Sequence, residues 1–528
     1  MIRRRNKLNS TDVLLRATQR TPILQDAIRS VVIQALQVMH PKAFNDGAPL
    51  NLLLSRRATL PGHIREKTPR TEVFPLPAAH ADSGKTTGFS EAQRIIWQDY
   101  LKFKPSDQAF RERLYITVGD QKTAAYGRAA AHRYRDSVNP FAARNWQVVP
   151  PALWHVKLNF LRLIARTHLR SKPQLSSYTT MESDAESLRL RHPSDADKAE
   201  YKPTRRLVYK MWVARICMYL YNRLIEGGDL EKPQHQRELT QFQIDGVLET
   251  KCDKVEAAIE WVTDMLTAPE TWNDDHDGLS PLNSEEVSTR RFMTEAAYFQ
   301  VLDSAMRTGA TDVIKDLLPR MAVLFYGAGK PLYGYEMLYL HWLLQPSTSD
   351  QPLQDAILAA SLVPQYHNGA HFIGTDLMLE HHNKEYKLDI RNQKNSTHTI
   401  LHTSDRVGTL SNILRRFQPA LETAFGSPRS NPHHPDSHDI PALYNRAIFL
   451  LYTIANPRQL SPDNRPWVSK NIFKIGTSAL LDKLQKFNYD REYGSLEAEV
   501  QEGLETAYEL DAIHNGLGLS DSSSDDDL

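Results

Sequence analysis

The chain has 528 residues and a mass of 60.3 kDa, which is long enough to bury a large core and to divide into two or three lobes. Its composition of 41% apolar and 24% charged residues is that of an average globular protein, and it excludes collagen-like, coiled-coil and wholly disordered chains. The formal net charge is only +1, but the charges are unevenly distributed along the chain.

No segment predicts a membrane span, a secretory signal or a disulfide framework. The apolar stretch at 448–455 is far shorter than the roughly 20 residues of a spanning helix. The basic amino terminus is not followed by the apolar core and cleavage site of a signal peptide. Cys217 and Cys252 are the only cysteines, too few for a cysteine-rich zinc site. We therefore expect an intracellular protein, nuclear or cytoplasmic, with no membrane partner.

The first third of the chain predicts both helices and strands. Thr21 can cap a helix that begins at Pro22 and runs through Met39, because its apolar residues have helical spacing. Ser90 and Gln93 form a capping-box pattern that predicts the start of another helix. Alternating apolar residues predict a strand at 113–119. A second, shorter strand is predicted at 146–149, where Pro150 and Pro151 end it and introduce a helix over 152–169.

The remainder is predicted to be mainly helical. Helical periodicity covers 205–226, 247–266, 291–307, 313–326, 332–344, 372–390, 441–456 and 468–487. Surface loops are predicted at 171–204, 267–290, 345–354 and 425–440. The expected regions are an N-terminal helical region (1–100), a basic α/β core segment (101–172), a helical insertion with an acidic linker (173–370), a late core helix region (371–424), C-terminal helices (425–514) and a disordered acidic tail (515–528).

Charge is concentrated in two stretches of opposite sign. Residues 101–172, here called the basic block, contain fourteen Lys or Arg against four acids, whereas residues 241–290 contain twelve acids against three basic residues. The basic block could bind a phosphate backbone, because neutralising phosphates releases counterions. It could equally be a solvated face that docks onto the acidic stretch of its own chain.

Asp120 directly follows the predicted strand 113–119. A carboxylate at a strand end can reach a cleft and hold a divalent cation, and two such cations can assist phosphodiester chemistry. The alternative is that Asp120 caps the next helix or begins a turn. His155 could line a site close to Asp120, or it could be a core histidine bonded to backbone.

A second group of polar residues lies in the predicted helix 372–390. Asp376, Glu380, Asn383, Lys384 and Lys387 would share one helical face. Glu380 could complete a metal site with Asp120, whereas the alternative is an ordinary Glu380–Lys384 pair on a solvent face. The predicted nucleic-acid contacts are Lys122, Arg128, Arg133, Arg135, Lys157, Asn383, Lys384 and Lys387.

Several motifs together resemble a fungal domain family of unknown function, catalogued under the number 6589. They are HPKAF at 40–44, VGDQKT at 118–123, LWHVKLNFL at 153–161, FYGAGKPLYGYEMLYLHWLL at 325–344 and GTDLMLEHHNKEYK at 374–387. The resemblance covers roughly residues 41–416. That family is similar in layout to cut-and-paste transposases, whose ribonuclease-H-like core carries a strand-end Asp, a large helical insertion and a late helix bearing Glu.

This resemblance implies a mainly α protein with a small ribonuclease-H-like α/β core, and Asp120 and Glu380 as the second and third acids of a catalytic triad. The first acid is not found, because Asp12, Asp26 and Asp46 lie in helix-like or loop-like sequence. Mg²⁺ or Mn²⁺ is implied only if the carboxylate site is intact, and DNA is the implied partner. We therefore expect a transposase-derived nucleic-acid protein in which the missing first acid severely impairs two-metal catalysis, or alternatively a non-enzymatic helical interaction or structural protein.

Overall fold

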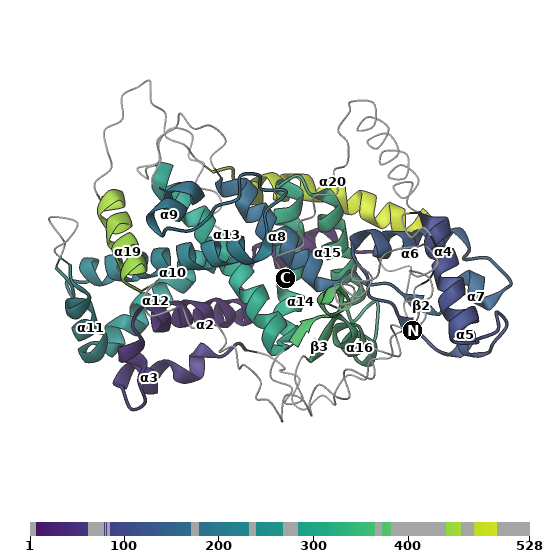
Figure 1. Ribbon diagram of the computed structural model, residues 1–528, viewed down its shortest axis with the longest axis horizontal. Helices are drawn as coiled ribbons and strands as arrows, with labels where there is room; N and C mark the ends of the chain where they lie inside the picture. Colours follow the sequence, from purple (N-terminus) through teal and green to yellow (C-terminus); the bar gives the residue numbers. More distant parts are fainter. Residues whose placement is uncertain are drawn as a thin grey trace, which may run out of the picture.

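The computed structural model describes residues 7–61, 76, 79, 81, 85–169, 179–231, 239–267, 284–364, 372–381, 440–455 and 469–493. Asn383, Lys384 and Lys387 and the predicted acidic tail lie outside these residues. The described part is mainly helical, as the sequence predicts (Figure 1). None of its helices is long and apolar enough to cross a membrane.

The N-terminal elements begin the helical body. They are α1 (Ser10–Thr18), α2 (Pro22–Met39), two 3₁₀ turns (Pro41–Phe44 and Ser55–Ala58) and α3 (Pro49–Leu54). Helix α2 has the predicted bounds. The Thr21 hydroxyl accepts a hydrogen bond from the Leu24 N–H at 3.2 Å, and Pro22 supplies the first helical residue without losing a needed donor.

Residues 86–149 form a small lobe at one end of the molecule (Figure 1). Its elements are α4 (Thr86–Arg94), a π-helical turn (Ile95–Tyr100), α5 (Ala109–Glu112), β1 (Tyr115–Ile116), α6 (Gln121–Arg133), α7 (Pro140–Ala143) and β2 (Gln147–Val148). The predicted capping box is wrong, because α4 begins at Thr86 and includes Ser90 in its interior. The lobe has separate aromatic clusters, one of which is built on Phe110, Phe141 and Trp146.

Both predicted strands of the small lobe exist and pair in parallel. Tyr115 lies opposite Gln147 and Ile116 lies opposite Val148, and a further parallel bridge joins Gly119 to Pro151. Helices α6 and α7 provide the crossover that parallel strands require. The strands are shorter than predicted, and the described residues hold only this pair and one other two-stranded sheet.

The helical body consists of long helices around one continuous apolar core. These are α8 (Leu153–His168), α9 (Met181–Ser187), α10 (Tyr201–Glu226), α11 (Gln241–Thr250), α12 (Cys252–Thr267), α13 (Ser284–Thr308), α14 (Thr311–Gly327), α15 (Pro331–Leu343), α16 (Gln351–Ser361), α19 (Ile440–Ala455) and α20 (Ile472–Tyr493). The predicted helix 247–266 is two helices that meet at Lys251. Helices α9 and α16 lie partly or wholly within segments predicted as loops.

The second sheet pairs β3 (Leu362–Pro364) antiparallel with β4 (Phe372–Gly374). Residues 375–381 then continue as a helix. The predicted helix 372–390 therefore begins three residues too early. Phe372 is buried at 1% exposure, so tertiary burial favours an extended start where the sequence pattern favours a helix.

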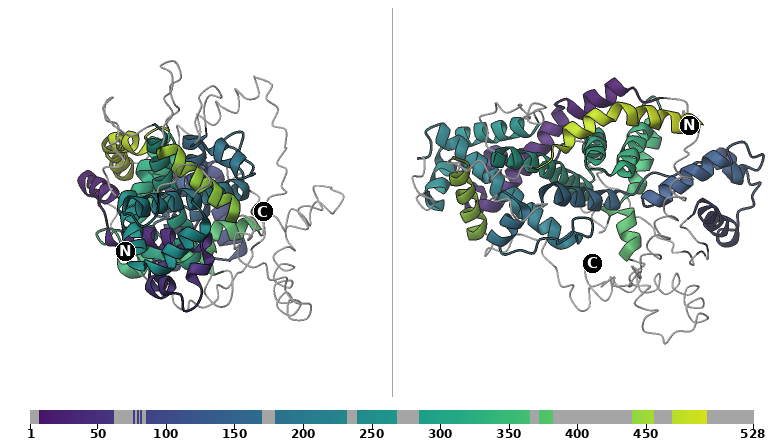
Figure 2. Two further views of the ribbon diagram at one scale, coloured as in Figure 1. Left: turned by 90° about the vertical axis from the view of Figure 1, so that its left-hand side faces the viewer. Right: turned by 90° about the horizontal axis from the view of Figure 1, so that it is seen from above.

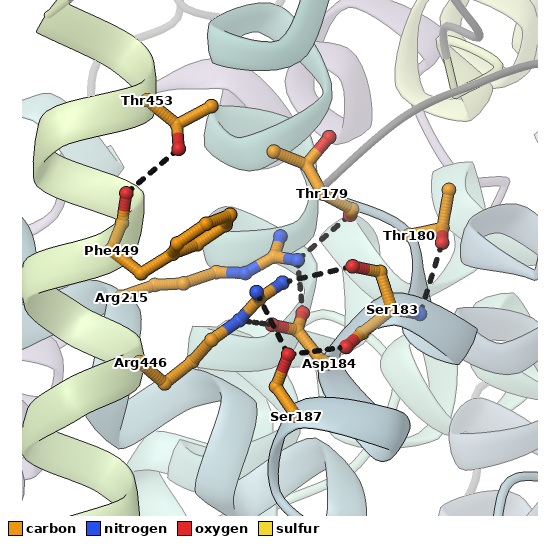
Figure 3. A network of polar contacts seen from close by, with 9 residues as sticks. All are labelled: Thr179, Thr180, Ser183, Asp184, Ser187, Arg215, Arg446, Phe449 and Thr453. Atoms are coloured by element: carbon orange, nitrogen blue, oxygen red, sulfur yellow. Dashed lines mark hydrogen bonds and ion pairs between the residues drawn. The ribbon is translucent and has the colours of Figure 1, made fainter.

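Distant parts of the chain lie side by side in the body. Helices α1 and α20 pack together (Figure 2), and the Leu8 N–H donates to Asn488 Oδ1 at 2.9 Å. Helix α19 is joined to α9 and α10 by a buried charge cluster (Figure 3). There Asp184 forms ion pairs with both Arg215 and Arg446, and all three side chains are at most 3% exposed.

Candidate functional site

Asp120 lies at the carboxyl end of β1 and is the N-cap of α6. Its Oδ1 accepts a hydrogen bond from the Thr123 N–H at 2.8 Å, so the capping interpretation is confirmed. Gly119 is needed beside it, because a Cβ at this position would lie 2.4 Å from Thr123 Cγ2. The Asp120 side chain is half-buried, and its cap role uses one of its two carboxylate oxygens.

The amino end of α8 lies at the same edge, because β1 and β2 are parallel and α8 follows β2. The N-cap residue Ala152 has no polar side chain to accept from the first helical N–H groups. Asp376 performs this task from 222 residues away in sequence. Its Oδ1 accepts from the Trp154 N–H at 3.2 Å and its Oδ2 from the His155 N–H at 2.9 Å, where the helix dipole also favours a negative charge.

Asp376 also orients the imidazole of His155. The distance from His155 Nδ1 to Asp376 Oδ2 is 2.8 Å, so the Nδ1–H donates to the carboxylate and leaves Nε2 to face other groups. Asp376 is buried, whereas the His155 side chain is 26% exposed. Gly374 permits this approach, because a Cβ there would lie 2.6 Å from Asp376 Oδ1 and 2.9 Å from Trp154 Cβ.

Three carboxylates act on this one imidazole. Burial lowers the pKa of His155, but the hydrogen bond and charge of Asp376 and the charges of Asp120 and Glu380 outweigh burial, so the pKa is raised. Glu380 is half-buried on the helix 375–381. We call Asp120, His155, Asp376 and Glu380 the acidic centre. The structure thus brings the two predicted catalytic residues, Asp120 and Glu380, into the electrostatic surroundings of the same histidine.

Helix α15 forms a further side of the acidic centre. Burial and the charge of Asp120 raise the pKa of Tyr333 to about 12, and its hydroxyl accepts a hydrogen bond from Asn159 Nδ2 at 2.7 Å. Glu336 is 1% exposed and binds Arg128 through both carboxylate oxygens. Burial raises the pKa of Glu336, and the Arg128 charge opposes this effect.

The predicted nucleic-acid contacts fall into two groups. Arg128 is half-buried and pairs with Glu336, whereas Lys157 is buried and its Nζ lies 2.9 Å from Asp303 Oδ1. Their charges are therefore neutralised by carboxylates of the same chain. Lys122, Arg133 and Arg135 are exposed on or just beyond α6, and Arg135 pairs with its neighbour Asp136.

The acidic centre offers few side chains that could bind a metal ion. Within the described residues, no three His, Cys, Asp or Glu side chains are grouped closely enough to bind a metal ion. Asp376 already accepts from α8 and from His155, which leaves Asp120 and Glu380 as possible ligands. The early acids Asp12 and Asp26 lie on α1 and α2, so neither takes the place of a first strand-borne acid.

The profile of a family of unknown function, DUF6589, matches residues 3–434. The chain belongs to DUF6589. No curated protein and no solved structure matches it. The DUF6589 match spans the small lobe, the body helices through α16 and every member of the acidic centre.

Sequence reasoning alone did not find the role of Asp376 in this DUF6589 protein. Asp376 shares the predicted face with Glu380, but its partners are the backbone and imidazole at 154–155. The available signal was the absence of a polar N-cap before α8, where Pro150, Pro151 and Ala152 precede the helix. Such a helix start requires an acceptor from elsewhere.

Proposed function

We propose that this DUF6589 protein binds nucleic acid and that Asp120 and Glu380 bind one Mg²⁺ or Mn²⁺ beside the phosphate backbone. The observation that supports this proposal is the convergence of Asp120, Asp376 and Glu380 on His155, at the edge where β1 and β2 end. Half-buried carboxylates are the ligands that such cations prefer, and a bound cation attracts phosphate oxygens.

The members of the acidic centre have different tasks in this proposal. Asp376 is a positioning residue, because its oxygens hold α8 and the imidazole. His155, with its Nδ1–H fixed on Asp376, can donate from a protonated Nε2 to a phosphate oxygen. Asp120 offers the oxygen that does not cap α6. One cation held by two carboxylates suits binding better than strand cleavage, which uses two metal ions in a two-metal mechanism.

The phosphate-binding surface in this proposal consists of Lys122, Arg133 and Arg135, together with Asn383, Lys384 and Lys387 beyond the described helix 375–381. Arg128 and Lys157 are removed from it, because each is held by a buried carboxylate. A transposase-like ancestor that lost its first acid and with it catalysis is the proposed origin, and the layout of Asp120, helical insertion and Glu380 supports it.

The experiment is binding of the purified protein to labelled double- and single-stranded DNA over a salt series, with and without Mn²⁺. The test variant is Asp120→Asn with Glu380→Gln, which removes both charges. Asn is as good an N-cap as Asp, so α6 keeps its cap. Asp350→Asn is the matched control, because Asp350 caps α16 through the Leu353 N–H at 3.2 Å and is not part of the acidic centre.

We expect binding that weakens steeply with salt and a Mn²⁺ enhancement that is lost in the double variant and kept in Asp350→Asn. Replacing Arg133 and Arg135 with Ala should lower the salt slope by roughly 2. A Mn²⁺ effect that survives in the double variant would show that Asp120 and Glu380 do not bind the metal ion. Absence of DNA binding at low salt would contradict the proposed nucleic-acid function.

A second candidate is a helical protein-interaction module without enzymatic activity. The observation that favours it is the internal neutralisation of part of the basic block, through Arg128 with Glu336 and Lys157 with Asp303. A basic surface used only for phosphate would not need these buried carboxylates. Failure of DNA binding at low salt, with the protein folded, would make this candidate the better description.

A further inference from the structure

Arg144 is a buried cation that forms no ion pair with a carboxylate in the part of the chain that the structure describes. It follows α7 in the small lobe with a left-handed backbone conformation (φ 52°), which is unusual for a residue other than glycine. Its side chain is buried, at 3% residue exposure. The half-buried Arg128 and the buried Arg215 and Arg446, in contrast, each bind a carboxylate.

The guanidinium uses few of its donors. Nη2 donates to the Ser90 carbonyl at 3.3 Å, but Nε and Nη1 are buried without an acceptor. The guanidinium carbon lies 5.3 Å from the ring centre of Phe141 and 5.9 Å from that of Phe89. Burial lowers its pKa to about 10, so the side chain is still a cation at neutral pH.

A neutral donor lies beside this cation. The Ser90 hydroxyl oxygen is also buried without a hydrogen-bond partner, and the carbonyl of the same residue accepts from Arg144. A buried charge without a partner is strongly unfavourable, and buried polar atoms are nearly always hydrogen-bonded. An acceptor with negative charge and several oxygens would satisfy both residues at once.

We propose that Arg144 and Ser90 form a binding site for a small oxyanion of the phosphate class. Arginine matches phosphate because its fixed N–H donors can contact two oxygens together, and the Ser90 hydroxyl can donate to a third. The ligand is small, because the site is closed to solvent at the Arg144 side chain. This site is separate from the acidic centre and does not depend on the proposed nucleic-acid function.

The test is equilibrium dialysis of the full-length protein with radiolabelled inorganic phosphate at constant ionic strength. We expect saturable binding that is at least tenfold weaker in Arg144→Met, since hydrogen bonds to charged groups contribute about 1.5–3 kcal/mol. Ser90→Ala should weaken binding by about 2–10-fold. Arg111→Met is the matched control, because Arg111 is exposed on α5 and removes the same charge without altering the site.

Competition tests the chemical class and the size of the ligand. Unlabelled phosphate should displace the probe, whereas acetate should displace it poorly. Displacement by a nucleoside monophosphate would contradict a site that is limited to a small oxyanion. Arg144→Met should remain folded by far-UV circular dichroism, because replacing an unpaired buried charge with an apolar side chain is neutral or stabilising. If Arg144→Met is unfolded, the phosphate affinity of Ser90→Ala tests the proposal instead. Absence of saturable binding, or equal affinity in the wild-type protein and the Ser90 and Arg144 variants, would overturn the proposal.

Discussion

A close crossing of two helices in the body makes a quantitative prediction about Gly476. Helices α14 and α20 cross with their backbones in contact: a Cβ on Gly476 would lie 1.9 Å from the Val323 carbonyl oxygen, and a Cβ on Gly327 would lie 1.7 Å from the Ile472 carbonyl oxygen. The obstructing atoms are backbone atoms, so no rotamer change can relieve the clash. Gly476→Ala therefore forces the two helices apart.

The size of the effect follows from this geometry. To bring the new Cβ from 1.9 Å to an ordinary contact of 3.4 Å, α20 must move by about 1.5 Å over a buried crossing. Overpacking of this kind costs up to about 3 kcal/mol. The higher helix propensity of Ala returns about 1 kcal/mol, so the free energy of unfolding should fall by about 2 kcal/mol. Gly327→Ala should have a similar effect.

Urea unfolding followed by circular dichroism measures this change, with Gly246→Ala as the control. Gly246 lies within α11 and a Cβ there meets no atom within 4 Å, so this variant should be stabilised by up to about 1 kcal/mol. The double variant of Gly327 and Gly476 should cost much less than the sum of the single variants, because one separation relieves both clashes. Additive costs, or a neutral Gly476→Ala, would refute the reasoning.

Three further predictions concern buried or coupled charges. Asp184→Asn leaves Arg215 and Arg446 without their carboxylate and should lower the free energy of unfolding by about 3–5 kcal/mol; a loss below 1 kcal/mol in urea titrations would contradict this. Burial lowers the pKa of His341 to about 4, so about 3 kcal/mol of stability should be lost as pH falls from 6.5 to 4, and His341→Gln should reduce that slope. The pKa of His155 is raised, so its contribution to stability is present below pH 6.5 and is lost as pH rises through the folded-state pKa. In histidine NMR titrations, Asp120→Asn should lower the pKa of His155. An unchanged pKa would show that Asp120 does not act on the imidazole.

The sequence alone was enough for features that depend on neighbouring residues. Thr21 and Pro22 define the start of α2 because a hydroxyl cap and a fixed φ act within one helical turn. Alternating apolar residues located β1, and the prolines at 150–151 located the end of β2 and the start of α8. The alternative role of Asp120 as a helix cap was also predictable, since its acceptor function uses a backbone N–H three residues away.

Only the tertiary structure decided which charges meet. Asp376 was assigned to a helix face by its spacing, but its partners at Trp154 and His155 lie 222 and 221 residues away, and no local pattern encodes such a pairing. For the same reason the sequence could not show that Lys157 is neutralised by Asp303. Helical periodicity specifies which face is buried, whereas the neighbour that covers the face depends on how all the helices pack together.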